Sequence, residues 1–220
     1  MQNLEDRDIR QRDIIPPQKL ARCRATVIGV GSIGRQVALQ LAAIGTRSLQ
    51  LIDPDIVAVE NLASQGFLED DLGSAKVHAT ANMCHQISSQ IDIQCEQSRF
   101  RRSGDYGNCF FICVDAIATR QRIWESVGTS AGFYVDGRMS AEVLRVVTAC
   151  DPASRAYYPT TLFATGEAHR GSCTSKSTIF CANVAAGLMV SSFSKHLRNS
   201  PVDSDLHINL FANELSVTVC

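Results

Sequence analysis

The chain has 220 residues, of which 45% are hydrophobic, and a formal net charge of -1 from 21 Lys and Arg residues against 22 Asp and Glu residues. This length allows a sizeable buried core within a single α/β domain, and the near balance of charge argues against a basic surface for nucleic acid or anionic lipid. No apolar run approaches the roughly 18 residues of a membrane-spanning helix, and residues 1–6 are polar rather than typical of a signal peptide, so we expect a cytoplasmic protein that binds neither nucleic acid nor membrane.

The first predicted strand leads into a glycine-rich turn. Residues 24–30 form a β-rich run, and the apolar residues that follow recur at helical spacing. Gly29 would allow the tight turn, Gly31 would let a phosphate approach the backbone, and Gly34 would let the helix pack closely on the sheet. The free N–H groups of the helix's first turn, which begins at Ser32, would then form an anion site.

Asp53 strengthens this interpretation. It ends a second apolar run, residues 48–52, and lies about 20 residues beyond the glycines, where a carboxylate is expected to bind ribose hydroxyls. A glycine-rich turn without a ligand is the alternative, and Asp53 makes it the weaker one. Because the segment beyond Asp53 differs from that of most dehydrogenases, the site points to ATP rather than NAD.

The remainder of the chain alternates between strand and helix patterns, without an internal repeat. We predict helices over 74–89, 118–127 and 177–197, strands over 91–97, 110–115, 133–135, 142–150 and 206–219, and a long irregular excursion over 151–171. This order predicts a Rossmann-like, doubly wound, mainly parallel sheet with added C-terminal strands. We expect one domain over residues 1–220, with an N-terminal arm over 1–20 and a crossover loop over 151–175.

The chain contains nine cysteines. Cys109 and Cys113 lie in an apolar run, where thiols behave as small core residues, and reduced thiols are the usual state in the cytosol. No C-x-x-C pair is present, so we predict no zinc site.

Several short motifs follow one another in a distinctive order. They are R-x-x-R-Q at residues 7–11, D-x-D-x-V at 53–57, N-L followed by Gln65 at 61–65, G-x-x-K at 73–76, and Val114-Asp115 at the end of a predicted strand. In this order the chain resembles the ThiF/MoeB/HesA family of E1-like adenylyltransferases, over roughly residues 7–197.

The resemblance implies ATP-dependent adenylation of a carboxylate, commonly the C-terminal glycine of a ubiquitin-like or sulfur-carrier protein. In that family's reaction, Asp53 would bind ribose, and Asp55 would belong to the same nucleotide site. Asn61, Gln65 and Lys76 would line the triphosphate, with the lysine offsetting charge at phosphorus. Asp115 would hold Mg²⁺.

Arg10 matches a family arginine that reaches into the neighbouring subunit's ATP site, which implies a homodimer. Each matched residue also has a simpler interpretation. Lys76 could be a solvated helix lysine, Asp115 a helix cap, Asn61 a turn residue, and Arg10 part of a solvated charged arm.

The chain departs from the family pattern at Ser64, which replaces the arginine of N-L-x-R-Q. A hydroxyl cannot replace the bidentate phosphate contact of a guanidinium, so activity should be reduced or another arginine should substitute. Arg138 is a candidate substitute, with a surface salt bridge as its alternative role.

Cys173 lies between the expected crossover loop and the following helix, where many relatives carry a cysteine that attacks the adenylate. A position near a helix N-terminus and a lysine favours the thiolate. A structural thiol is the alternative for Cys173, and Cys181 is the better candidate for a core residue.

Three classes of function remain open. We favour an adenylating enzyme that acts on a protein carboxylate and forms a thioester on Cys173. Ser64 makes a catalytically silent E1-like partner subunit credible. A NAD-dependent oxidoreductase is opposed by Asn61, Gln65 and Lys76.

Overall fold

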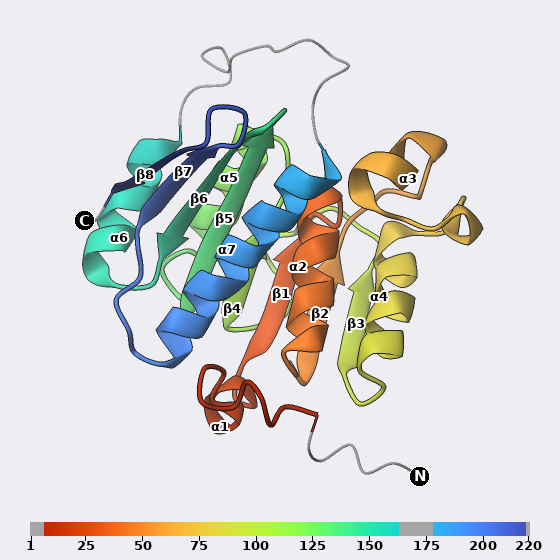
Figure 1. Cartoon of the computed structure of the whole chain (residues 1–220), viewed down its shortest axis with the longest axis horizontal. Coiled ribbons are helices and arrows are strands. Elements are labelled where there is room, and N and C mark those ends of the chain that lie inside the picture. The colour runs from red at the N-terminus through yellow and green to blue at the C-terminus, as the bar shows by residue number, and fades with distance from the viewer. Residues whose placement is uncertain (1–6, 163–177, 219–220) are drawn as a thin grey trace.

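A computed structural model describes residues 7–162 and 178–218 of the chain. Its centre is an eight-stranded sheet with the order β3-β2-β1-β4-β5-β6-β7-β8 (Figure 1). The strands are β1 (Arg24–Ile28), β2 (Ser48–Ile52), β3 (Asp92–Glu96), β4 (Cys109–Ile112), β5 (Phe133–Ser140), β6 (Val143–Ala149), β7 (Asp205–Asn209) and β8 (Glu214–Thr218). The strands β3, β2, β1, β4 and β5 pair with their neighbours in parallel. The strands β5, β6, β7 and β8 pair antiparallel. The predicted fold class is therefore confirmed.

Helices cover both faces of the sheet. They are α1 (Pro17–Leu20), α2 (Ser32–Ala43), α3 (Val59–Gln65), α4 (Lys76–Ile87), α5 (Ile117–Val127), α6 (Pro152–Tyr157) and α7 (Ile179–Leu197). Residues of α2, α4 and α7 share one buried apolar cluster, whereas α5 contributes to a second cluster on the opposite face. No helix in the described part of the chain has the length and apolar character needed to cross a membrane.

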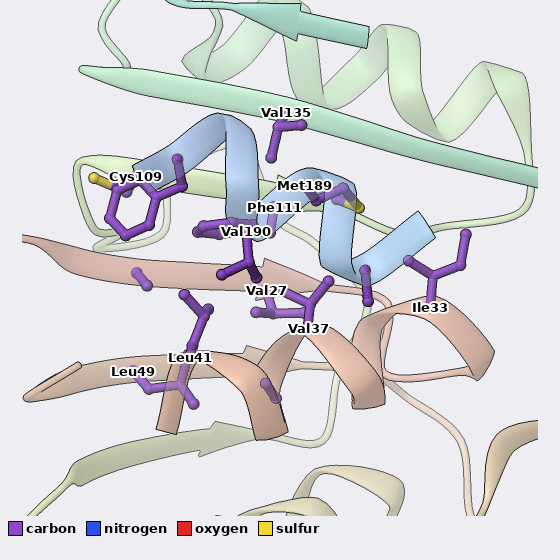
Figure 2. Close-up of a cluster of buried hydrophobic side chains, with 14 of the residues drawn as sticks. Val27, Ile33, Val37, Leu41, Leu49, Cys109, Phe111, Val135, Met189 and Val190 are labelled. Atoms are coloured by element: carbon purple, nitrogen blue, oxygen red, sulfur yellow. The ribbon is translucent and has the colours of Figure 1, made fainter. Parts of the chain in front are cut away.

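Strand β4 is apolar and buried along its whole length, because helices cover both of its faces. In β4, Cys109 and Phe111 belong to the α2 and α7 cluster, whereas Phe110 and Ile112 belong to the α5 cluster. Figure 2 shows the first cluster, to which Val27 of β1, Val37 of α2 and Met189 of α7 all belong. Such burial stabilises by about 1.5–3 kcal/mol for each large side chain.

The direction in which the chain builds the sheet reverses between β1 and β4. From β1 the chain moves to β2 and β3 on one side of the sheet, and then returns to β4 and β5 on the other. In open α/β sheets, ligands bind at the carboxyl ends of the strands where the strand order reverses in this way. The turn after β1 and the loop after β4 both lie at this position.

Two of the sequence predictions were wrong in detail. The excursion over 151–171 begins with regular structure, because the Asp151 carboxylate accepts hydrogen bonds of 3.0 Å from the backbone N–H groups of Ala153 and Ser154 and caps α6. Pro152 favoured a loop in the sequence, yet proline is well tolerated in the first turn of a helix. A 3-10 helix, η3 (Tyr158–Thr161), follows, and residues 163–177 lie outside the described part of the chain.

The predicted strand over 206–219 is a hairpin of β7 and β8 instead. Asn213 adopts a positive φ of 56° in the connecting turn, a conformation in which asparagine is enriched. Two further bounds matter for the site: β4 ends at Ile112 rather than at Asp115, and β5 extends to Ser140 because β6 pairs with it beyond the end of β4.

Candidate functional site

In the glycine turn, a side chain would clash with neighbouring backbone at two of the three glycines. Gly29 has a positive φ of 87°, and a Cβ there would lie 2.8 Å from the backbone of Cys113. A Cβ on Gly34 would overlap the carbonyl oxygen of Gly29. At Gly31 the nearest atom to a Cβ would be Gln65 Oε1, at 3.8 Å. Gly29 and Gly34 are therefore required for packing, whereas the space at Gly31 stays open to a ligand.

Asp53 holds this turn in place. Its Oδ2 accepts a 2.6 Å hydrogen bond from the Val30 N–H, and its Oδ1 accepts a 2.8 Å bond from the Asp55 N–H. Burial raises the pKa of Asp53, although these two backbone donors favour the charged form. Each carboxylate oxygen has a second acceptor direction, so ribose hydroxyls can still bind.

Lys76 is the first residue of α4 and is buried, with 8% of its side chain exposed. Its Nζ lies 3.3 Å from Asp55 Oδ2, and its backbone N–H donates a 3.0 Å bond to the Asp55 carbonyl. The interpretation of Lys76 as a solvated lysine is therefore wrong. Asp55, which the sequence placed in the nucleotide site, contacts Lys76 and fixes its position.

The N-L-x-R-Q segment forms α3. Asn61 Oδ1 accepts a 3.0 Å hydrogen bond from the Ala58 N–H at the start of this helix, so Asn61 lies on a helix rather than in a turn. Ser64 Oγ donates to the Glu60 carbonyl of its own helix. Gln65 Oε1 is buried and has no hydrogen-bond partner among the described residues.

An unpaired buried amide oxygen is unfavourable, so Gln65 fits a ligand that supplies its partner. The same amide can turn to present its NH₂ group, which donates to phosphate oxygens. Because this amide faces the open space at Gly31, the two residues define one place for an anionic ligand.

Asp115 lies in the loop between β4 and α5 and is exposed. The N-cap of α5 is Ala116, without a side-chain cap, so the interpretation of Asp115 as a helix cap is wrong. No group of three or more His, Cys, Asp or Glu residues suited to a metal ion occurs in the described part of the chain. A single carboxylate beside bound phosphates is nonetheless a common Mg²⁺ site, so Asp115 fits Mg²⁺ held together with a nucleotide.

Sequence reasoning missed Arg120 and Asp136, which anchor the loop of Asp115. Arg120 is buried on α5, pairs with Asp136 and donates to the carbonyl oxygens of Val114 and Gly137. Burial lowers the pKa of Arg120 to about 10. Its only sequence signal is its spacing with Ile123 and Val127, which places an arginine on the buried face of an amphipathic helix.

Arg138 lies within β5 and is not a surface ion pair, because only 13% of its side chain is exposed. Its Nε donates to Asp136 Oδ2 at 2.9 Å, and its Nη atoms donate to the carbonyl and hydroxyl oxygens of Thr161 at 2.8 and 2.9 Å. These contacts within the chain engage the guanidinium, so the structure does not favour Arg138 as the substitute for the missing motif arginine.

Arg10 is exposed, and its neighbours anchor the arm that carries it. Arg7 Nη2 donates to the carbonyl oxygens of Ala42 and Ala43 at the end of α2, and Gln11 donates to the carbonyl of Ile44. This arm and α1 precede β1, at the opposite end of the strand from the glycine turn (Figure 1). Arg10 therefore lies far from the candidate site of its own chain.

Of Cys173 and Cys181, which the sequence analysis compared, the structure describes only Cys181. Cys181 is fully buried on α7, and burial raises its pKa, as expected for a core residue. Cys173 lies outside the described residues. The structure thus brings together the glycine turn, Asp53, Asp55, Gln65 and Lys76. Asp115 lies in the loop after β4, whose backbone at Cys113 and Val114 lies beside Gly29.

Comparisons with known proteins identify relatives of the chain in sequence and in fold. The chain is 30% identical over 112 residues to the sulfur carrier protein ThiS adenylyltransferase of Escherichia coli strain K12, a match that spans 48% of this chain and 45% of that protein. It is 35% identical over 77 residues to the adenylyltransferase and sulfurtransferase MOCS3-1 of Zea mays, across 34% of this chain and 16% of that protein.

The crystal structure of E. coli MccB superposes with a TM-score of 0.74 at 17% identity, over 92% of this chain and 63% of MccB. MccB has also been solved with ATP and with MccA. The chain thus spans less than two thirds of MccB and under half of the two sequence relatives. The ThiF family model matches residues 6–213, and the chain belongs to the ThiF family.

Proposed function

We propose that the chain binds Mg·ATP at the glycine turn and adenylates a carboxylate, namely the C-terminal glycine of a ubiquitin-like or sulfur-carrier protein. The observation that carries the proposal is the buried Lys76, which Asp55 holds 3.3 Å away, beside Asp53 and the open space at Gly31. A dinucleotide site does not require a buried lysine at this place. The ATP complex of MccB and the names of the sequence relatives support the same chemistry.

Each residue has a defined task in this reaction. Asp53 binds the ribose, and the N–H groups at Gly31 and Ser32 bind phosphate at the start of α2. Lys76 and Gln65 contact the triphosphate, where Lys76 stabilises the charge that develops at phosphorus. Asp115 would hold Mg²⁺, which neutralises phosphate charge when it is bound.

The chemical step is an in-line displacement. A carboxylate oxygen of the carrier forms a bond to the α-phosphorus, the bond from that phosphorus to the bridging oxygen breaks, and pyrophosphate leaves with the electron pair. In a second step, the thiolate of Cys173 attacks the acyl carbon, forms a thioester and releases AMP. We further propose that the enzyme is a cytoplasmic homodimer in which Arg10 completes the site of the partner subunit.

ATP–pyrophosphate exchange with candidate carrier proteins tests the proposal. Lys76→Ala should retain its fold and lose exchange on the order of 10²-fold, because one preorganised charge contact is removed. Lys195→Ala is the matched control, since Lys195 is another helix lysine paired with an aspartate, Asp203, at 2.8 Å. Exchange at the wild-type rate in folded Lys76→Ala would show that the lysine has another role.

The second candidate is a catalytically silent partner subunit. It is favoured by Ser64, whose hydroxyl donates to the Glu60 carbonyl instead of reaching the glycine turn. Such a subunit would bind ATP in calorimetry but show no exchange with any carrier. Binding of NAD more tightly than ATP would favour an oxidoreductase over both candidates.

A further inference from the structure

A buried charge cluster connects β5 to the loop that carries Asp115. Asp136 on β5 is fully buried and lies between two guanidinium groups, those of Arg120 and Arg138. Its Oδ2 lies 2.8 Å from Arg138 Nη2 and accepts a 2.9 Å hydrogen bond from the Tyr158 hydroxyl. One carboxylate thus orients two arginines, of which only Arg120 reaches the loop after β4.

Arg120 determines the path of that loop. Its Nη2 donates to the carbonyl oxygens of Val114, the residue before Asp115, and of Gly137 on the neighbouring strand. The Cys113 N–H donates a 2.8 Å bond to the Ile28 carbonyl and holds the beginning of the loop. Among the described residues, the Asp115 carboxylate itself has no hydrogen-bond partner, so its position depends on these backbone anchors.

We propose that Arg120, oriented by Asp136, is a positioning residue that holds the Asp115 carboxylate where it binds Mg²⁺ together with ATP. The proposal rests on the function proposed above and adds Arg120 and Asp136, which lie outside the motifs named in the sequence analysis. Residues that orient a metal ligand from behind typically affect metal affinity on the order of 10–100-fold.

A second buried charge cluster, around Asp205, resembles the one around Asp136 and serves as a control for it. Asp205 on β7 has 2% of its side chain exposed, lies 2.6 Å from Arg145 Nη2 and accepts a 2.8 Å hydrogen bond from Tyr157. Asp136 and Asp205 are both register partners of Val147, so they lie in one row on the same face of the sheet. The cluster around Asp205 has the same chemistry, but among the described residues its hydrogen bonds and ion pairs go to Arg145, Tyr157 and His207 and not to the loop after β4.

The test compares Asp136→Asn, Arg120→Lys and Asp205→Asn by calorimetry with ATP, in Mg²⁺ and in EDTA. Mg²⁺ should raise the ATP affinity of the wild type relative to EDTA. In Asp136→Asn and Arg120→Lys we expect this increase to be smaller by a factor on the order of 10–100. Their affinity for ATP in EDTA should equal that of the wild type, because the glycine turn and Asp53 are untouched. Asp205→Asn should bind ATP like the wild type under both conditions.

Arg120→Lys keeps the positive charge and replaces the guanidinium by a single ammonium group, which cannot bind Asp136 and the loop carbonyl groups in the same geometry. It provides the test if Asp136→Asn does not fold. The proposal would be overturned if Mg²⁺ raised the ATP affinity of folded Arg120→Lys as much as that of the wild type. It would also be overturned if Asp205→Asn lost as much of this increase as the other variants. If the wild-type chain does not bind Mg·ATP, the proposed function and this inference fall together. If it does bind and the variants match it, the inference alone is wrong.

Discussion

Lys76 Nζ and Asp55 Oδ2 lie 3.3 Å apart and join the segment after β2 to the start of α4. An antiparallel bridge between Ile56 and Ala75 ties the same two segments through their backbones. The D-x-D-x-V and G-x-x-K motifs are therefore one structural unit, in which an aspartate sets the position of a buried lysine.

Asp55→Asn should lower pyrophosphate exchange strongly while leaving the fold intact. A displacement of about 1 Å in a catalytic group can reduce the rate on the order of 10²-fold. The free energy of unfolding should fall only modestly, by about 1–2 kcal/mol, because the Asp55 carboxylate is 63% exposed whereas its partner Lys76 is buried. Asp203→Asn, which frees Lys195, is the control, and full exchange in folded Asp55→Asn would contradict the role of this pair.

The glycines of the turn should separate binding from stability. Gly31→Ala should retain its free energy of unfolding within about 1 kcal/mol and weaken ATP binding, because its Cβ enters open space. Gly34→Ala should be destabilised by about 1–3 kcal/mol, because its Cβ overlaps the Gly29 carbonyl. Chemical unfolding measures the change in stability, and calorimetry measures the change in ATP affinity. Unchanged ATP affinity in Gly31→Ala would show that phosphate does not bind at Gly31.

Arg10→Ala should lose exchange without losing stability, since Arg10 is exposed. In contrast to Arg10→Ala, Arg7→Ala should lower the free energy of unfolding by about 0.3–1 kcal/mol, because Arg7 donates to carbonyl groups at the end of α2. If Arg10 acts in trans, mixing inactive Arg10→Ala with inactive Lys76→Ala should restore part of the exchange activity, because mixed dimers contain one intact site. A mixture that stays inactive although mixed dimers form would contradict action in trans.

Ser64→Arg restores the motif arginine and should raise pyrophosphate exchange by adding a bidentate phosphate contact. Its thermal unfolding should stay close to that of the wild type, because the hydrogen bond that the Ser64 hydroxyl donates within its own helix is exposed. Exchange that stays absent in Ser64→Arg, with ATP bound and carriers present, would favour the silent partner subunit.

Cys173→Ser should leave pyrophosphate exchange nearly intact and abolish a thiol-sensitive adduct with the carrier, because the thiol acts after the adenylate has formed. Mass spectrometry of the intact protein, with ATP and carrier, before and after thiol treatment, reads this outcome. An adduct that persists in Cys173→Ser would require another nucleophile. Cys181 is a poor one, since it is fully buried and burial raises its pKa.

The local pattern of the sequence determined the parts of this protein that depend on short-range rules. The turn at Gly29, the strand Ser48–Ile52 and the position of Asp53 all follow from periodicity, glycine geometry and spacing along one βαβ unit. The order of strands and helices likewise predicts the class of sheet, because parallel strands need helical crossovers.

Only the tertiary structure decided which charges become buried and which partners they take. Asp55 and Lys76 are 21 residues apart in the sequence, and Asp136 and Arg120 meet from different elements. No period or motif encodes such pairs. The Asp55–Lys76 pair forms only when the segment after β2 lies beside the start of α4. The Arg120–Asp136 pair forms only when β5 lies beside β4 and α5 packs on their shared face. The roles of Asp55, Arg120 and Arg138 therefore depend on long-range packing, which places each guanidinium or ammonium group against one carboxylate.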